Sequence, residues 1–205
     1  MLKQRIFHFL CAFTAIAILL AGCSFLRFAD QCADISDRVV RLHVLADSDT
    51  EEAQALKLAV RDRLLTEADS LLTTSVGNRD EALQQLEALL PALTVAAQEE
   101  LSAHGCALPV QLELRKTYFT TRTYGNFTLP AGTYDALRVI IGSGGGQNWW
   151  CILFPPLCLS ASFEKSLDAV LTEEEMDIVS NYPQYEIRFK LVEWIQNLAQ
   201  RLTSR

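Results

Sequence analysis

An uncharged run of residues, 6–26, lies between Arg5 and Arg27 at the start of the chain. A stretch of about 20 predominantly apolar residues is long enough to cross the hydrocarbon core of a bilayer as a helix. Lys3 and Arg5 precede the run, and basic residues stay on the inner side of a membrane. The sequence therefore predicts that everything after Arg27 lies outside the cytoplasm, and only those residues are available to form a water-soluble fold.

The end of this run resembles the lipobox of bacterial lipoproteins, because small residues precede a cysteine in Leu20-Ala21-Gly22-Cys23. In lipoproteins the leader is removed and the cysteine thiol carries a diacylglyceryl group. Two acyl chains are enough for stable attachment to a membrane. We expect a lipoprotein-type export signal at residues 1–22 and lipidation of Cys23. A retained signal anchor is the alternative, and the sequence leaves both open.

The composition of the remaining chain favours one exported domain. Half of the 205 residues are hydrophobic, and there are nine Gly and six Pro, as in an ordinary globular protein. The net charge is −7, and the leader contributes only basic residues to it. An acidic chain repels phosphate backbones, so we expect no nucleic-acid partner. We expect a tether at residues 23–37 and a single globular domain at residues 38–205.

The cysteines agree with export. Four of the six lie beyond the apolar run and the lipidation candidate: Cys32, Cys106, Cys151 and Cys158. Four cysteines permit three pairings, and none of them has the C-x-x-C spacing of zinc ribbons or redox sites. Cys151 and Cys158 enclose two prolines, and a disulfide between them would stabilise the fold by roughly 2.5 kcal/mol. We expect that disulfide in an oxidising compartment, the alternative being a core strand with two incidental thiols.

The hydrophobic periodicity predicts an α+β fold of two layers, with a largely antiparallel sheet and two or three helices packed on one face. Ser48 and Glu51 are spaced as in a capping box and predict the start of the first helix, and Asn78 predicts the start of the second. Acidic residues at 160–183 indicate a surface helix or spacer. The expected strands are 38–46, 110–124, 134–141, 148–154 and 185–192, and a closing helix is expected at 193–203.

Motifs for catalysis or cofactor binding are incomplete in this chain. The glycine-rich loop at residues 142–147 matches neither nucleotide-binding template, so we expect a hairpin loop and no cofactor. The acids from Asp47 to Glu52 lack the spacing of a calcium loop, which favours helix capping and no metal. His43 and His104 have no partner in a known catalytic motif, so we interpret them as a strand histidine and a helix-end histidine. We therefore expect a protein that is not an enzyme.

The most unusual segment is residues 148–158, which holds two of the three tryptophans, two cysteines and a Pro-Pro pair. Tryptophans are enriched at protein interfaces. In a strand, Trp149 and Trp150 point to opposite faces, so both faces are apolar. The predicted partner-binding residues are Trp149, Trp150, Phe154, Pro155 and Pro156, with Tyr124 and Asn126 next.

Four segments resemble the stage II sporulation protein R family of endospore-forming bacteria. They are RLHVLADSD at 41–49, YGN at 124–126 with LPAGTY at 129–134, NWWCILFPPLC at 148–158, and KLVEW at 190–194. They occur in the family's order over most of the chain, and the third is the most specific.

The resemblance implies a signalling protein that is made in the forespore and exported into the space between the forespore and mother-cell membranes. Its implied partner is a membrane-embedded aspartic protease, stage II sporulation protein GA, which then processes the precursor of sigma factor E. The resemblance implies no small-molecule substrate. Two other classes remain open: an extracytoplasmic hydrolase, which needs His43 or His104 near an acid, and a small-ligand-binding lipoprotein, which needs a sizeable apolar pocket.

Overall fold

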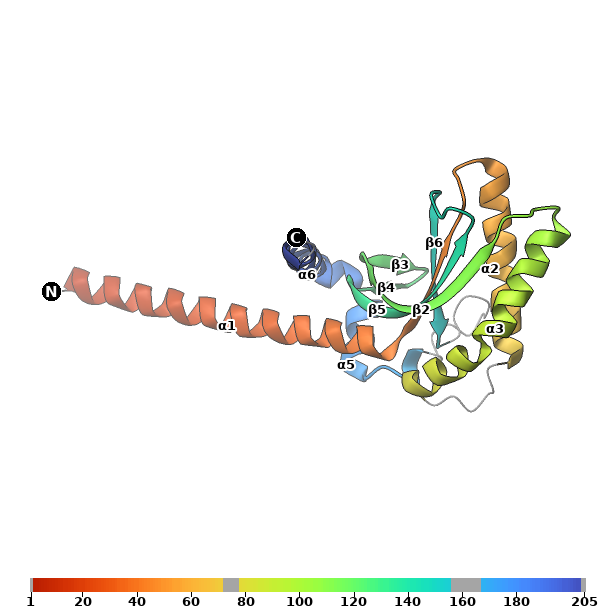
Figure 1. Cartoon of the computed structure of the whole chain (residues 1–205). Helices are drawn as coiled ribbons and strands as arrows, with labels where there is room; N and C mark the ends of the chain where they lie inside the picture. Colours follow the sequence, from red (N-terminus) through yellow and green to blue (C-terminus); the bar gives the residue numbers. More distant parts are fainter. Residues whose placement is uncertain (1, 72–77, 156–166, 204–205) are drawn as a thin grey trace.

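The computed structural model describes residues 2–71, 78–155 and 167–203. A long N-terminal helix projects from a sheet that has helices on both sides (Figure 1). The helices are α1 (Leu2–Arg38), α2 (Glu51–Leu71), α3 (Arg79–Ala103), α5 (Glu173–Ser180) and α6 (Tyr182–Thr203). The strands are β1 (Val40–Leu45), β2 (Val110–Phe119), β3 (Arg122–Tyr124), β4 (Phe127–Leu129), β5 (Gly132–Ile141) and β6 (Asn148–Phe154).

The main sheet has four strands in the order β2-β5-β1-β6, and β3 and β4 form a small separate sheet. β2 pairs antiparallel with β5, and β6 pairs antiparallel with β1, whereas β1 and β5 are parallel. The α+β class is confirmed. The central parallel pair was not expected, and it places β1 between β5 and β6. The glycine-rich loop at 142–147 therefore crosses the end of β1 and is not the hairpin loop that we expected.

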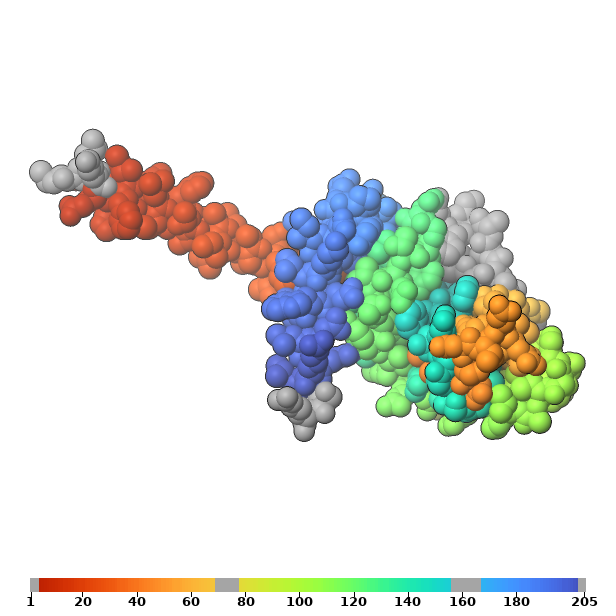
Figure 2. Space-filling model, turned by 90° about the horizontal axis from the view of Figure 1, so that it is seen from above, coloured from red at the N-terminus to blue at the C-terminus, as the bar shows by residue number. Residues whose placement is uncertain are grey.

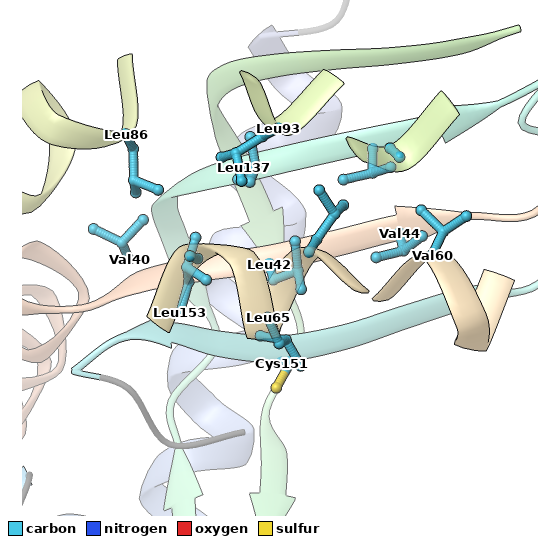
Figure 3. Packing of buried hydrophobic residues seen from close by; sticks show 14 of the residues in the cluster. Val40, Leu42, Val44, Val60, Leu65, Leu86, Leu93, Leu137, Cys151 and Leu153 are labelled. Carbon is cyan, nitrogen blue, oxygen red and sulfur yellow. The ribbon is translucent and has the colours of Figure 1, made fainter. Parts of the chain in front are cut away.

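One face of the sheet packs against α2 and α3. Val40, Leu42 and Val44 of β1 alternate toward this side, as the sequence pattern predicted. In Figure 3 they meet residues such as Val60 and Leu65 from α2 and Leu86 and Leu93 from α3. Asn78 caps α3 through its side chain, which accepts from the Glu81 amide, as predicted. Burial of these apolar side chains is the main stabilising term for this half of the domain.

The opposite face of the sheet is covered by α5, α6 and the end of α1, so the helices pack on both faces and not on one face as expected. Ile152 of β6 lies in this second cluster, together with Phe28 of α1, Ile178 of α5 and Phe189 of α6. The segment 160–183, which was expected to be a surface helix or spacer, contains the helix α5, but this helix also contributes to the core, because Ile178 and Val179 are buried. Residues 160–166 lie outside the described part of the chain.

The expected tether at residues 23–37 is helical instead. It forms the last turns of α1, and Phe28, Cys32 and Ile35 of this stretch are buried. Their spacings of four and three residues place them on one side of a helix. Arg38, at the end of α1, forms an ion pair with the buried carboxylate of Glu175, at 3.1 Å between Nε and Oε1. The end of α1 is thus part of the fold.

The expected strand at 185–192 is also wrong, since these residues belong to α6. The segment alternates, but Tyr185, Phe189 and Val192 are spaced by four and three, and these are the residues that pack on the second cluster. The helix α2 is capped by Thr50 and not by the expected capping box of Ser48 and Glu51. The Thr50 hydroxyl accepts from the Ala53 amide at 3.3 Å.

Candidate partner-binding surface

A fully buried arginine lies on the second face of the sheet. The guanidinium carbon of Arg41 is 4.0 Å from the ring centroid of Phe119 and 4.9 Å from that of Tyr134. One of its amino groups donates to the hydroxyl of Tyr124. Within the described residues its other two nitrogens have no hydrogen-bond partner. Burial raises the pKa of the Tyr124 phenol, although the charge of Arg41 lowers it, and aromatic faces stabilise the cation.

His43 is two residues further along β1 and points to the same side. Its Nε2 is 2.9 Å from the Asn148 side-chain oxygen, and its ring lies 5.8 Å from the Trp150 ring, centroid to centroid. Burial lowers the pKa of His43, and the positive charges of Arg138 and Arg41 lower it further. The hydrogen bond with Asn148 opposes this shift, and the position of His43 within β1 agrees with the expected strand histidine.

A hydrolase would need an acid that orients one of the two histidines. The other nitrogen of His43 has no partner among the described side chains. His104 is exposed at the end of α3, where its Nδ1 lies 3.0 Å from the Glu100 carbonyl oxygen and 3.5 Å from the Glu100 carboxylate. A contact between exposed side chains one helical turn apart is a surface feature. The geometry around both histidines gives the hydrolase alternative no support.

The acids after β1 hold the glycine-rich loop. The Asp47 carboxylate accepts from the Ser143 amide at 2.7 Å, and the Asp49 carboxylate accepts from the Gln147 amide at 2.7 Å. A Cβ atom on Gly146 would lie 2.2 Å from the Ser48 carbonyl oxygen. The loop can therefore pass this closely only with glycine there. Asp47 and Asp49 fix the loop, in place of the helix-capping role that we expected.

The two tryptophans at the start of β6 each stack under an arginine from another element. The Arg61 guanidinium of α2 lies 4.3 Å from the Trp149 ring centroid, and that of Arg122 in β3 lies 3.8 Å from the Trp150 ring centroid. Trp149 is 37% exposed, whereas Trp150 is partly buried against the second cluster. β6 is an edge strand of the described sheet. Trp149 is thus an exposed aromatic side chain at a sheet edge.

The predicted partner-binding residues differ in how far they are exposed to solvent. Phe154 and Pro155 are buried, and their role in binding stays a prediction. Asn126 is exposed, Tyr124 is half-buried under Arg41, and Pro156 lies outside the described residues. Sequence reasoning missed Arg61, Arg122 and Arg41, since nothing in the local pattern links an arginine to a distant ring.

The segments that carry the family resemblance meet in space. Arg41 contacts Tyr124 and Tyr134, His43 contacts Asn148, and Asp49 contacts the residue before β6. The segment 190–194 belongs to α6, whose buried residues reach the second cluster. Residues of all four segments thus meet on the second face of the main sheet: Tyr124 from the small sheet, Tyr134 and Trp150 from the main sheet, and Val192 from α6.

The structure does not test the expected Cys151–Cys158 disulfide or the expected lipidation of Cys23. Cys158, the expected partner of Cys151, lies outside the described residues, and so the disulfide stays a prediction. Cys32 and Cys106 are free thiols, and burial raises the pKa of Cys32 to about 12. Cys23 is an exposed free thiol within α1, and its lipidation also stays a prediction.

Two surface hollows of the described part of the chain are lined largely by charged side chains. One lies between α1, α5 and α6 and includes Glu173, Glu174, Asp177 and Arg188. The other includes Asp37, Arg38, Arg79 and Asp80. A small-ligand site is usually concave and mostly apolar. Neither hollow has that character, so neither favours the small-ligand alternative.

Comparison with known proteins gives a consistent result. Residues 36–164 match the family model described as stage II sporulation protein R. The chain is also 31% identical over 186 residues to a protein of Bacillus subtilis (strain 168) named stage II sporulation protein R. That match covers 80% of this chain and 83% of the relative. No solved structure matches the fold.

Proposed function

The chain belongs to the stage II sporulation protein R family, and we propose that it is an exported signalling protein that activates a membrane-embedded aspartic protease. The protease would be the mother cell's stage II sporulation protein GA, and its substrate the precursor of sigma factor E. The observation that carries the proposal is the combination of family membership with an N-terminal helix long and apolar enough to cross a membrane. Such a helix is typical of an export signal or an anchor, and this supports our proposal that the sheet lies outside the cytoplasm.

The surface around Trp149 is our candidate for the contact with the protease. Its indole is held by Arg61 at the edge of the sheet, so little conformational freedom is lost on binding. Asn148, the residue before Trp149, is exposed and is hydrogen-bonded to His43. Rigid aromatic side chains near an edge strand are frequent anchors of protein interfaces. Activation would then be a binding event and would need no catalytic group on this chain.

The test is reconstitution in a host that does not sporulate. The full chain is expressed together with the protease and the sigma-factor precursor, and precursor cleavage is followed by immunoblot. We expect cleavage only when all three proteins are present. Cleavage that is equal without this chain would contradict the proposal, as would cleavage that persists when the catalytic aspartates of the protease are replaced.

A matched variant tests whether the signal acts from outside the cytoplasm. Replacing Leu10 and Ile16 with arginine breaks the apolar run, because an arginine in a membrane segment costs about 2.5–3.5 kcal/mol on insertion scales. Both side chains are exposed in α1, so the sheet is not disturbed. We expect this variant to accumulate in the cytoplasm and to leave the precursor uncleaved. Full activity of a cytoplasmic form would refute the role of export.

A further inference from the structure

The C-terminal helix α6 carries an exposed apolar stripe that no described part of the domain covers. Six large apolar side chains between 44% and 77% exposed form it: Ile187, Leu191, Trp194, Ile195, Leu198 and Leu202. Their spacings of three, four and seven residues place them on one side of a helix. Soluble proteins rarely leave so continuous a row of large apolar side chains in water. The stripe therefore indicates a surface that something else covers.

The stripe faces directly away from the domain. At about 100° per residue, Phe189, which is buried in the second cluster, lies on the opposite side of α6 from the centre of the stripe, and the buried Val192 lies next to Phe189. Basic residues border the stripe on both sides, with Arg188 on one and Lys190 and Arg201 on the other, and the acid Glu186 is ion-paired with Lys190 at 2.6 Å. The acid Glu193 points back to the domain, where its carboxylate accepts from the Thr121 amide at 3.3 Å.

This distribution of side chains is typical of a helix that lies in the plane of a membrane surface. Such helices bury an apolar face with Trp and Leu at the boundary between headgroups and acyl chains, and they have Lys and Arg on the polar side. Tryptophan prefers this level of the bilayer because its ring is amphipathic. A protein interface would not require the flanking charges to be basic, whereas anionic lipid headgroups attract them.

The contacts of α6 place it at the level where α1 leaves the membrane. The ring of Phe28 in α1 stacks on Tyr185 at 5.6 Å and meets Phe189 edge-on at 5.4 Å, centroid to centroid. Phe28 immediately follows Arg27, the charge that ends the apolar run. In Figure 2, α6 (blue) runs across the direction of α1 and lies on the side of the domain nearest the N-terminal part of α1. A helix in this place is parallel to the membrane if α1 is along its normal.

We propose that α6 docks on the surface of the membrane that holds the N-terminus, with its apolar stripe among the acyl chains and its basic residues against anionic headgroups. Both N-terminal anchors considered above bring α6 to that surface, since a lipid on Cys23 would lie only five residues before Phe28. The docked helix fixes how the sheet is oriented on the membrane. This inference does not rest on the signalling role and is tested without the protease.

The experiment uses the full chain reconstituted in vesicles of phosphatidylethanolamine and phosphatidylglycerol, with and without brominated acyl chains. The chain has three tryptophans, and so the difference between the native protein and Trp194→Phe isolates the Trp194 fluorescence. Bromine near the headgroup end of the acyl chain should quench Trp194 more than bromine near the chain end, because an interfacial helix is shallow. Leu198→Glu, in the same stripe, should lower this quenching by about half or more and shift the Trp194 emission to the red.

Val95→Glu provides the matched control. Val95 is an apolar residue of α3 that is 57% exposed, and α3 lies on the other side of the sheet. This variant should leave the quenching of Trp194 unchanged. Two outcomes would overturn the proposal. In the first, an aqueous quencher still quenches Trp194 and brominated lipid does not, which would indicate that the stripe binds another protein. In the second, Trp194 is protected from the aqueous quencher only under conditions in which two copies crosslink through α6, which would indicate a dimer.

Discussion

The guanidinium of Arg61 on α2 lies over the indole of Trp149 on β6, 4.3 Å from the ring centroid. The contact joins a helix to the edge strand of the sheet and leaves the outer part of the ring exposed. Trp150, next in the chain, instead lies under Arg122 and packs on the second cluster. Two adjacent tryptophans thus have different structural roles, and their substitution should have different effects.

Trp149→Ala should abolish precursor processing while the protein remains folded, because the side chain is an exposed anchor and its loss opens no core cavity. Trp150→Ala should lower the free energy of unfolding by about 2 kcal/mol, since a half-buried ring and its cation–π contact are lost. Denaturant unfolding in detergent, run beside the processing assay, separates the effects. Normal processing by both variants, or loss of activity only in step with unfolding, would place the contact surface elsewhere.

Tyr124→Phe should destabilise the fold by about 1–3 kcal/mol, because it removes a hydrogen bond to the buried guanidinium of Arg41. Tyr118→Phe is the matched control. The Tyr118 hydroxyl is buried without a hydrogen-bond partner among the described residues, and so its removal should cost close to nothing. Chemical unfolding of the two variants gives the comparison. Equal effects would mean that the bond to Arg41 contributes no net stability.

Gly146→Ala should displace the glycine-rich loop, since the new methyl group would lie 2.2 Å from the backbone oxygen of Ser48, which also accepts from the Gln54 side chain of α2 at 2.8 Å. Gly145→Ala, one residue away, has its nearest contacts at 3.3 and 3.4 Å and should be tolerated. Amide hydrogen exchange of the loop and of residues 47–49 measures the difference. Exchange that is unchanged in Gly146→Ala would show that the loop adapts freely.

Cys151 and Cys158 should be disulfide-bonded in the exported protein. An exported protein would meet an oxidising compartment, and the two prolines between these cysteines reduce the number of conformations that the intervening loop can adopt. Alkylation followed by peptide mass spectrometry should label both thiols only after reduction. Cys106, a free and partly exposed thiol, should react without reduction and serves as the internal control. Labelling of Cys151 without reductant would reject the bond.

Cys23 should carry a diacylglyceryl group if the export signal is of the lipoprotein type. Mass spectrometry of the protein extracted from membranes should then find a mature chain that begins at a modified Cys23. Cys23→Ala should block both the modification and the cleavage. A mature protein that keeps Met1 would establish the retained anchor instead, and the interfacial position of α6 is expected in either case.

The sequence determined the features that depend on local pattern. The apolar run between two arginines predicts a membrane-spanning helix whatever the tertiary structure, because its length and its lack of charge are sufficient for that prediction. The alternation of Val40, Leu42 and Val44 placed these residues on one face of a strand, and Asn78 marked a helix start. The block around Trp149 carries enough specific residues to indicate the family by itself.

Only the tertiary structure decided what lies beside what. The strand pattern at 185–192 failed because Tyr185, Phe189 and Val192 fit a helical period equally well, and burial against Phe28 selects the helix. The aromatic surroundings of Arg41 and the separate arginines over Trp149 and Trp150 come from elements distant in sequence. The spacing of the apolar residues on α6 can be read from the sequence, but the sequence does not tell which side of the helix packs on the domain. Packing decides this, because both sides of α6 carry apolar residues and helix propensity does not distinguish them.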